Sequence, residues 1–249
     1  MGNAARPVAI VTGGSRGIGA ATVARLTQCG YDVVATYRQD EQAARLVTAA
    51  VPAGAEVHFV RADLATEAGI QAPFTFASQR FGRLDALINN AGLSTRYAKL
   101  ADTPADEVRR TIEVNFTAAV LSSRLAVQAF LRLGTPGTIV NITSGAATLG
   151  SPSEYVHYAA AKAGLDAFTL GLGKETGPQG IRVVAVAPGL TDTDLHTTTG
   201  DAGRVERMAA ELPLRRAASA DEIAATVQWL LSPDAAYITA TTVRVAGGR

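Results

Sequence analysis

The sequence of 249 residues has one cysteine, almost no net charge and no sign of a polyanion-binding patch. Because Cys29 is the only cysteine, we expect no internal disulfide and no thiolate metal cage, as in proteins of a reducing compartment. We interpret Cys29 as a small packed thiol. The formal net charge is +1, from 23 Lys and Arg against 22 Asp and Glu, and the basic residues are scattered. This balance argues against nucleic acid and anionic membranes as partners.

Segments for membrane insertion and secretion are also missing. No run reaches the roughly 18 apolar residues that a membrane span requires. The first residues lack the charged and then apolar pattern of a secretory signal. His58, His157 and His196 have no metal-ligand spacing, so no metal is expected. We interpret His157 as a packing or surface residue, because it points away from the face that Tyr158 and Lys162 share. We therefore expect a cytoplasmic protein that binds neither nucleic acid nor membrane.

What the sequence does contain is an alternation of short apolar runs with helical segments. Runs such as VAIV and VVAVA are apolar at nearly every position, as expected of parallel strands covered by helices on both faces. Ser219 and Glu222 form a capping box that begins the last helix. The pattern predicts an α/β fold with one doubly wound, Rossmann-like sheet of about seven parallel strands. The predicted strands are Val8–Thr12, Asp32–Thr36, Val57–Val60, Ala86–Asn89, Thr138–Thr143, Val183–Ala187 and Thr242–Val245.

No repeat, low-complexity tract or Pro/Gly-rich linker divides the chain, so residues 1–249 are predicted to form a single domain. The segment over about residues 190–218 departs from the regular pattern, being rich in Thr, Asp and Gly at first and weakly helical later. Long insertions in compact domains are usually functional or disordered. We predict a flexible substrate flap here, with His196 as a candidate substrate contact.

A glycine-rich turn, TGGSRGIG over residues 12–19, follows the first strand directly and precedes a helix. Glycines let the backbone turn tightly and approach a pyrophosphate, which then lies on the free N–H groups of the helix N-terminus. Gly13, Gly17 and Gly19 are spaced GxxxGxG instead of GxGxxG, and a purely structural turn is the alternative interpretation. The position after strand one favours a nucleotide site.

The end of the second strand, ATYR, bears on which nucleotide is bound. An acidic residue there favours NAD, whereas a basic residue accommodates the 2′-phosphate of NADP. Arg38 stands at this place and Arg16 lies in the glycine loop, while Asp40 and Glu41 come later and are expected to open the next helix. The two arginines predict NADP, with NAD less favoured; solvated surface charges are the alternative.

The segment YVHYAAAKAG, residues 155–164, predicts acid–base chemistry. On a helix Tyr158 and Lys162 are neighbours, whereas Tyr155 has only Ala159 at the same offset. A free phenol titrates at about pH 10, and an adjacent ammonium favours the phenolate and lowers that pKa. Tyr158 is therefore the candidate general acid/base for a carbonyl or an alcohol, and Tyr155 is interpreted as wall or packing.

Other polar residues accompany this pair at predicted strand ends and in a helix. Ser144 follows the buried strand in GTIVNITS, where ligands of open α/β sheets bind, and its hydroxyl can polarise a carbonyl. The motif NNAG, residues 89–92, closes the fourth strand in the same way. Asn115 lies in an apolar helical stretch, so its amide needs a structural or catalytic partner.

With TGxxxGxG, NNAG, an internal Asn, a Ser and YxxxK in this order, essentially the whole chain resembles the short-chain dehydrogenase/reductase family in its common short form. The resemblance implies that Ser144 orients the substrate oxygen and that Tyr158 is the general acid/base. It further implies that Lys162 binds the nicotinamide ribose and lowers the phenol pKa, and that Asn115 supports a proton relay through water. The expected cofactor contacts are Gly13, Ser15, Arg16, Gly17, Ile18, Gly19, Arg38, Asp63, Leu64, Asn90, Ala91, Gly92, Tyr158, Lys162, Pro188, Gly189, Thr191 and Thr193.

The expected function is an NADP(H)-dependent oxidoreductase that interconverts a ketone or aldehyde and an alcohol, with hydride carried by the cofactor. A non-catalytic nucleotide-sensing module is the alternative, and the joint presence of serine, tyrosine and lysine argues against it. A sugar-nucleotide epimerase would need a longer chain with a separate substrate lobe. Substrate identity stays open. The expected pocket residues are Tyr97, Leu149, Pro152, Tyr155, Leu190 and Leu195.

Two expectations concern the outer surface of the molecule. The helices that carry Asn115 and Tyr158 are rich in alanine and leucine, and the resemblance implies that they pair between subunits in a homo-oligomer, a dimer or tetramer. The ending VAGGR places Ala246 where the family often has an acidic residue. We expect this departure to affect C-terminal packing or a subunit contact and not the chemistry.

Overall fold

The computed structural model describes residues 6–193 and 203–249, and one parallel sheet organises them. Its seven strands lie in the order β3-β2-β1-β4-β5-β6-β9, and every neighbouring pair is parallel. The predicted seven-stranded doubly wound sheet is confirmed. The strands are β1 Val8–Val11, β2 Asp32–Tyr37, β3 Val57–Arg61, β4 Ala86–Asn89, β5 Thr138–Ile142, β6 Arg182–Pro188 and β9 Thr241–Val245.

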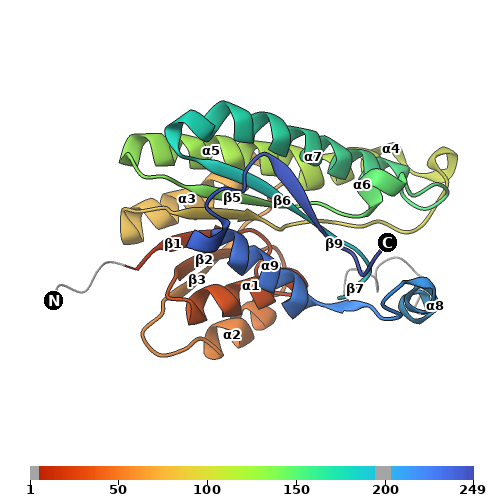
Figure 1. The fold of residues 1–249 in the computed structure, drawn as a ribbon, viewed down its shortest axis with the longest axis horizontal. Coiled ribbons are helices and arrows are strands. Elements are labelled where there is room, and N and C mark those ends of the chain that lie inside the picture. Colours follow the sequence, from red (N-terminus) through yellow and green to blue (C-terminus); the bar gives the residue numbers. More distant parts are fainter. Residues whose placement is uncertain (1–5, 194–202) are drawn as a thin grey trace.

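Helices cover both faces of this sheet, which gives three layers (Figure 1). In this view α3, α4, α5 and α7 lie above the sheet, and α1, α2 and α9 lie below it. The helices α1 and α2, which connect β1 to β2 and β2 to β3, lie on one face (Figure 1). The helices α3, α5 and α7, which lead to β4, β5 and β6, lie on the other face, because the strand order reverses after β3. The helices are α1 Gly17–Gln28, α2 Glu41–Ala49, α3 Glu67–Phe81, α4 Ala105–Ile112, α5 Ala118–Leu133, α6 Ala146–Leu149, α7 Val156–Thr176, α8 Arg204–Glu211 and α9 Ala220–Leu231.

The apolar strands are explained by burial on both sides. In β1, Ala9 and Val11 pack into the core layer under α1 and α9, whereas Ile10 packs into the layer under α3 and α5. All four residues of β1 are buried. A strand with two covered faces has no solvent-facing side, so the alternation of apolar and polar residues that marks an exposed sheet is absent.

Side-chain caps fix where two helices begin. Asp40 Oδ1 accepts a hydrogen bond from the Ala43 N–H at 2.9 Å, so Asp40 caps α2 as expected. At α9, Ser219 Oγ accepts from the Glu222 N–H at 3.2 Å and the Glu222 carboxylate accepts from the Ser219 N–H at 2.9 Å. The predicted capping box is therefore confirmed.

The helical stretch Ala105–Leu133 joins α4 and α5 through a π-helical turn at Glu113–Thr117. Among the described residues it alone is long and apolar enough, by length and composition, to cross a membrane, with a mean hydropathy of 1.3. In this fold α5 lies against α3 and α7 on one face of the sheet (Figure 1). Packing of a core helix accounts for its apolar residues.

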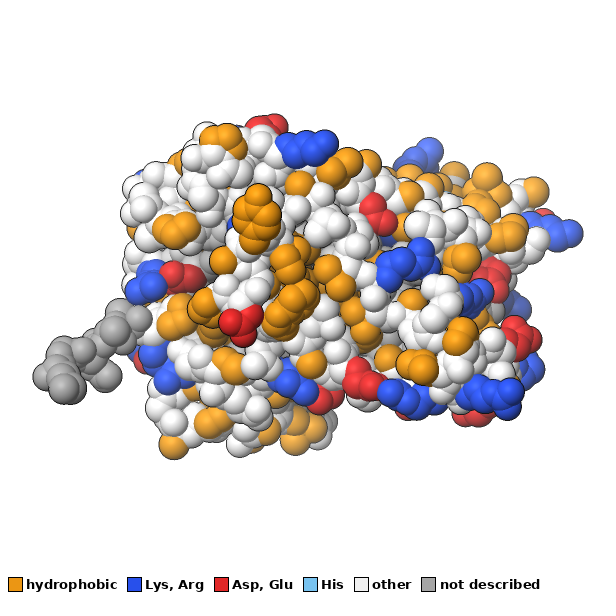
Figure 2. All heavy atoms as spheres, viewed as in Figure 1, with side chains coloured by type: hydrophobic (Ala, Val, Ile, Leu, Met, Phe, Trp, Pro, Cys, Tyr) orange, Lys and Arg blue, Asp and Glu red, His pale blue; other side chains and the backbone are white. Residues whose placement is uncertain are grey.

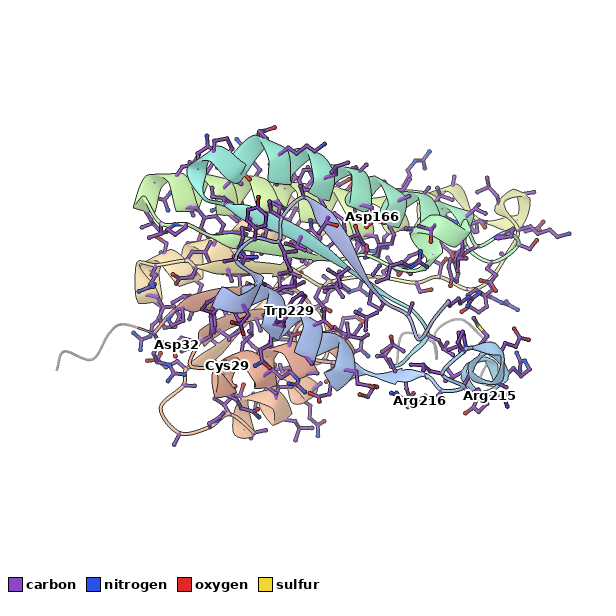
Figure 3. All side chains as sticks on the ribbon, viewed as in Figure 1. Cys29, Asp32, Asp166, Arg215, Arg216 and Trp229 are labelled. Carbon is purple, nitrogen blue, oxygen red and sulfur yellow. The ribbon has the colours of Figure 1, made fainter. Side chains whose placement is uncertain are left out.

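Two features differ from the sequence-based expectation. The segment 190–218 begins and ends in a short parallel pair, β7 Thr191–Asp192 with β8 Ala218–Ser219, which no pattern predicted. Cys29 is exposed, so its interpretation as a packed thiol is wrong. It follows the last turn of α1, on the side of the sheet that also carries α9 (Figure 3).

Candidate active site

A cleft of about 620 Å³ opens at the carboxyl ends of the strands. Ser144, Tyr158 and Lys162 line it together with every predicted cofactor contact except Gly19. Asn115 does not line it. The sequence motifs, far apart along the chain, therefore lie in one cavity, as expected at the strand ends of an open α/β sheet.

The glycine loop has the backbone shape that its residues predict. Gly13 and Gly17 have φ angles of +66° and +51°, a region that side chains rarely adopt. Gly19 is required for another reason, because a Cβ there would overlap the carbonyl oxygen of Gly13 and lie 2.5 Å from Asn90 Nδ2. Gly19 therefore packs directly against the backbone of the glycine loop and does not line the cleft.

The NNAG motif holds the glycine loop in place. Thr12 Oγ1 accepts hydrogen bonds from the N–H groups of Asn90 and Ala91, both at 3.0 Å. In return Asn90 Nδ2 donates to the carbonyl oxygens of Thr12 and Gly13, at 2.9 and 3.0 Å. Asn90 thus has a structural task that the sequence did not predict, besides its position in the cleft wall.

The N-terminus of α1 faces the cleft with positive character. The helix begins at Gly17, its N-cap Arg16 makes no side-chain cap, and its first turn contains no acidic residue. Ser15, Arg16 and Ile18 line the cleft here. Free N–H groups and the positive end of the helix dipole suit a phosphate group.

The end of β2 presents the Arg38 cation, and the nearby Asp40 carboxylate, which also lines the cleft, caps α2. Tyr37, Arg38 and Gln39 line this part of the cleft, and Arg61 Nε donates to the Arg38 carbonyl oxygen at 3.3 Å. Asp63, at the end of β3, is bound through both carboxylate oxygens by Arg110, each at 3.1 Å. Burial alone would raise the pKa of Asp63, but the Ala65 N–H and the Arg110 guanidinium hold it below its ordinary value.

Ser144, Tyr158 and Lys162 form the chemical end of the cleft. The Tyr158 side chain is 8% exposed and its hydroxyl hydrogen-bonds with Ser144. Ser144 Oγ also accepts from the Ala146 N–H at 3.1 Å, which fixes its position. Lys162 Nζ lies 5.8 Å from the centre of the Tyr158 ring and donates to the Ile142 carbonyl oxygen at 2.8 Å.

Burial dominates the titration of this pair. It raises the pKa of Tyr158 to about 12, against the hydrogen bond with Ser144, which lowers it. Burial also lowers the pKa of Lys162 to about 8. The pKa of Tyr158 is therefore raised and not lowered as expected, because burial of the phenolate outweighs the hydrogen bond with Ser144.

Asp166 is the charged neighbour that the sequence analysis missed. It lies one turn after Lys162 on α7, on the side toward β9 (Figure 3), and accepts a hydrogen bond from Thr242 Oγ1 at 2.9 Å. Its negative charge raises the pKa of Lys162 and partly offsets the effect of burial. The spacing of four residues between Lys162 and Asp166 is the signal that could have identified it.

Asn115 is buried and has structural partners. Its Nδ2 donates to the carbonyl oxygens of Leu93 and Thr111, at 2.8 and 2.9 Å, and its Oδ1 accepts from the Leu93 N–H at 3.2 Å. It lies within the π-helical turn between α4 and α5. The side-chain amide therefore joins the loop after NNAG to this turn. This is the structural role, one of the two roles that the sequence left open.

A buried polar network connects the elements around the site. Asn89 Nδ2 donates to Asn141 Oδ1 at 2.8 Å and to Ser123 Oγ at 2.9 Å. Asn141 Nδ2 in turn donates to Thr169 Oγ1 at 2.9 Å. The network joins β4 and β5 to α5 and α7, and only Asn89 was noted in the sequence, as part of NNAG.

Aromatic rings form one wall of the substrate end. Tyr155 packs edge-on against Tyr158 and tilted against Tyr97, with ring centres 5.1 Å apart in both pairs. Tyr97, Leu149, Tyr155 and Leu190 line the cleft as expected, whereas Pro152 does not. Leu195 and His196 lie outside the described residues. The cleft lining that sequence reasoning missed includes Met208, Arg244, Ala246 and Arg249.

Two remaining expectations have different outcomes. Ala246 lines the cleft and packs on Gly189, where an added Cβ would come within 2.7 Å of Ala246 Cα, so its position is not remote from the site. His157 is buried beside Tyr158 with its Nε2 3.2 Å from Thr95 Oγ1, and burial lowers its pKa. Its interpretation as a packing residue is confirmed.

Comparison with known proteins places this geometry in a family. The family model described as enoyl-(acyl carrier protein) reductase matches residues 13–249. An uncharacterized oxidoreductase, YgfF of Escherichia coli, is 41% identical over 97% of this chain and 99% of its own length. A 3-oxoacyl-[acyl-carrier-protein] reductase of Synechocystis is 37% identical, over 97% of this chain and 96% of its own. A short-chain dehydrogenase from Burkholderia cenocepacia, solved in complex with NADP, is 34% identical and superimposes with a TM-score of 0.89 over 97% of each chain.

Proposed function

Because the chain belongs to the short-chain dehydrogenase/reductase family, whose NAD(P)-dependent members act on CH–OH groups, we propose that it interconverts a ketone or aldehyde and an alcohol with NADP(H). The observation that carries this proposal is the single cleft that holds Ser144, Tyr158 and Lys162 at one end and the glycine loop at the other. The nicotinamide supplies or accepts the hydride when the dinucleotide is bound.

The roles of the polar residues follow from their contacts. Ser144, fixed by the Ala146 N–H, holds the carbonyl oxygen of the substrate, and Tyr158 donates the proton to it. A pKa of about 12 leaves the phenol protonated at neutral pH, which suits proton donation during carbonyl reduction. The Lys162 ammonium stabilises the phenolate that remains, and Asn115 supports the path by which a proton returns.

We expect Tyr158→Phe to lower kcat by about 10²- to 10⁴-fold, because general acid catalysis is lost while the ring and its packing remain. Initial rates of NADPH oxidation with a panel of ketones and aldehydes measure the effect, and NADPH fluorescence titration should give nearly unchanged binding. Tyr155→Phe is the matched control, since it removes a hydroxyl from the neighbouring wall and should cost far less. An unchanged kcat in Tyr158→Phe refutes the proposed role.

The preference for NADP rests on charge at the adenosine end. Arg38 and Arg16 line the cleft, and the carboxylates nearest the end of β2 are engaged, Asp40 as a helix cap and Asp63 with Arg110. The relative from Burkholderia cenocepacia was solved with NADP. A guanidinium binds a 2′-phosphate best where no free carboxylate competes for it, and an engaged carboxylate does not compete.

We expect Arg38→Gln to lower kcat/KM for NADPH by about 10- to 100-fold, which is the size of one charge-assisted contact. The value of kcat/KM for NADH should change far less. Steady-state kinetics with both cofactors measure this. Arg45→Gln, an exposed arginine on α2 that pairs with Glu41, is the control and should change neither value. A wild-type enzyme with a higher kcat/KM for NADH would refute the assignment.

Assembly and location complete the proposal. Leucine and isoleucine side chains on α4, α5 and α7 are exposed, including Ile112, Leu131 and Leu170, and we propose that these helices pair in a homodimer or homotetramer. Light scattering tests this, and a monomer contradicts it. We propose a small carbonyl compound or alcohol as the partner in catalysis and the cytoplasm as the location. The predicted flap over residues 190–218 lies partly outside the described residues.

A further inference from the structure

Two arginines near the end of the chain line the cleft. Arg244 belongs to β9 and Arg249 follows it, and both side chains are exposed. Figure 1 marks the C-terminus to the right of the centre of the molecule, and Figure 2 shows several Lys and Arg side chains in blue on this half of the surface. The pyrophosphate-binding loop before α1 lies elsewhere in the same cleft, so these cations are separate from the site proposed for the dinucleotide phosphates.

Arg244 is held toward the reacting end of the cleft. Its Nη1 donates to Thr148 Oγ1 at 2.8 Å, and its Nη2 donates to an oxygen of Arg249 at 3.1 Å. Thr148 belongs to α6, four residues after Ser144. Ser144 lies two residues before α6, so the contact with Thr148 ties Arg244 to the segment that carries the proposed carbonyl-binding hydroxyl.

The charge of this pair is not balanced by side chains. Within residues 6–193 and 203–249, Arg25, Arg45, Arg83, Arg110 and Arg216 each form an ion pair with a carboxylate, whereas the ion pairs of this part of the chain include neither Arg244 nor Arg249. The Glu154 carboxylate also lines the cleft. The accepting oxygen of Arg249 contributes at most one negative charge against two guanidinium groups.

Apolar side chains line the cleft together with the two arginines and Tyr158. They are Leu149, Met208 and the rings of Tyr97 and Tyr155. The cleft therefore offers a substrate the polar pair Ser144 and Tyr158, apolar surface and a cationic group.

We infer, resting on the proposed function, that the substrate is an anionic carbonyl compound or alcohol, with a carboxylate bound by Arg244 and Arg249 and separated from the reacting carbon by a short apolar chain. Arginine binds carboxylates through two parallel N–H donors, and Arg244 keeps further donors besides the two in use. The arginines act on specificity and not on proton transfer.

Matched pairs of acid and ester test this inference. Levulinate and 5-oxohexanoate are each compared with their methyl esters as substrates for NADPH oxidation, since each pair differs in charge at nearly constant length. We expect wild-type kcat/KM to be at least about 10-fold higher for an acid than for its ester, and the ratio to fall as salt is added, because both arginines are exposed.

The variants separate charge from structure. Arg244→Gln should reduce the acid-to-ester ratio by about 10- to 100-fold, and Arg244→Lys by less, because a lysine keeps the charge without the paired donors. Arg249→Gln should reduce the ratio without removing the contact to Thr148. Arg132→Gln, an exposed arginine on α5 outside the cleft lining, is the control and should leave the ratio unchanged.

The outcomes distinguish the inference from the proposal beneath it. The inference of an anionic substrate is overturned if the acid-to-ester ratio of kcat/KM is near one in both pairs. It is also overturned if Arg244→Gln and Arg249→Gln leave this ratio unchanged. In either case turnover of the esters still supports the proposed oxidoreductase. If wild-type protein that binds NADPH turns over no acid, ester or other carbonyl compound, the proposed oxidoreductase itself is refuted.

Discussion

At the scale of single residues, Lys162 shows how burial and charge oppose each other. Its side chain is 3% exposed, it has one carbonyl oxygen as hydrogen-bond partner, and burial lowers its pKa to about 8. The role that we propose for Lys162 requires a charged ammonium, and the fold keeps this group in a place where its charge costs folding free energy. Such costs are common at functional sites.

The sequence predicted correctly that Tyr158 and Lys162 are neighbours but gave the wrong direction for the pKa of Tyr158. Helical spacing decides that Tyr158 and Lys162 share a face, which is local information. The pKa depends on how deeply α6 and the strand ends bury the phenol, which is set by residues distant in sequence such as Ser144 and Tyr97. The sequence of residues 155–164 by itself does not tell how deeply the phenol is buried.

The cost of burying Lys162 predicts a pH-dependent stability difference. In the folded state the pKa is depressed, so below about pH 8 the fold contains the buried charge in full, and the cost is relieved as pH rises from about 8 toward 10.5. The free energy of unfolding of wild type minus that of Lys162→Met should therefore rise by roughly 2 to 3 kcal/mol between pH 7 and pH 10.5. Urea unfolding at fixed protein concentration measures it.

Comparison with the methionine variant cancels the other groups that titrate in this range, because both proteins contain them. Lys162→Met also loses the bond to the Ile142 carbonyl oxygen, but this loss is the same at every pH. The variant should have little activity at any pH. A difference in stability that does not change with pH would show that the ammonium is solvated in the folded protein.

At the scale of elements, the strands and helix starts were predictable because their signals are local and repeated. Apolar runs such as that of β6 mark strands with both faces covered, and Ser219 with Glu222 marks the start of α9. The pair β7 and β8 has two residues in each strand, too few for any periodicity. The π-helical turn around Asn115 likewise comes from a tertiary contact, the one with Leu93.

The buried network between β5 and α7 predicts coupling between these elements. Asn141→Ala should lower the free energy of unfolding by about 2 to 4 kcal/mol, because it opens a cavity and removes partners from Asn89 and Thr169. Thr169→Val removes the acceptor with little change in shape. The double variant should be less destabilised than the sum of the two by about 1 kcal/mol. Urea unfolding of the four proteins completes the cycle, and strict additivity would contradict a shared network.

At the scale of the whole molecule, the strand pattern predicted the sheet and the meeting of the motifs at one edge of it, but not the complete lining of the cleft. Alternating strands and helices predict parallel strands, and the rules for crossovers place their carboxyl ends together, so the meeting of NNAG, Ser144 and the glycine loop was foreseeable. Arg244 and Arg249 come from the last strand and beyond, in a segment with no motif. Their place in the cleft follows from the pairing of β9 with β6, which only the fold reveals.

The opposite end of the sheet is held by Arg182, which begins β6. Its Nη1 donates to the carbonyl oxygens of Ala235 and Ile238, at 3.3 and 3.2 Å. Its Nη2 donates to the Leu230 carbonyl oxygen at 2.8 Å and to Thr138 Oγ1 at 3.0 Å. One guanidinium therefore joins β5 and β6 to the end of α9.

Because the cleft lies at the carboxyl ends of the strands, Arg182 should govern stability and not catalysis. Arg182→Leu leaves several carbonyl oxygens without a donor and should lower the free energy of unfolding by about 2 to 5 kcal/mol. Arg182→Lys should recover only part, since a single ammonium cannot reproduce the planar fork. Urea unfolding gives the stability, and kcat/KM for NADPH at a temperature where the variants are folded should match wild type. A fall in kcat/KM at full stability would instead mean that the two ends of the sheet are coupled through β6.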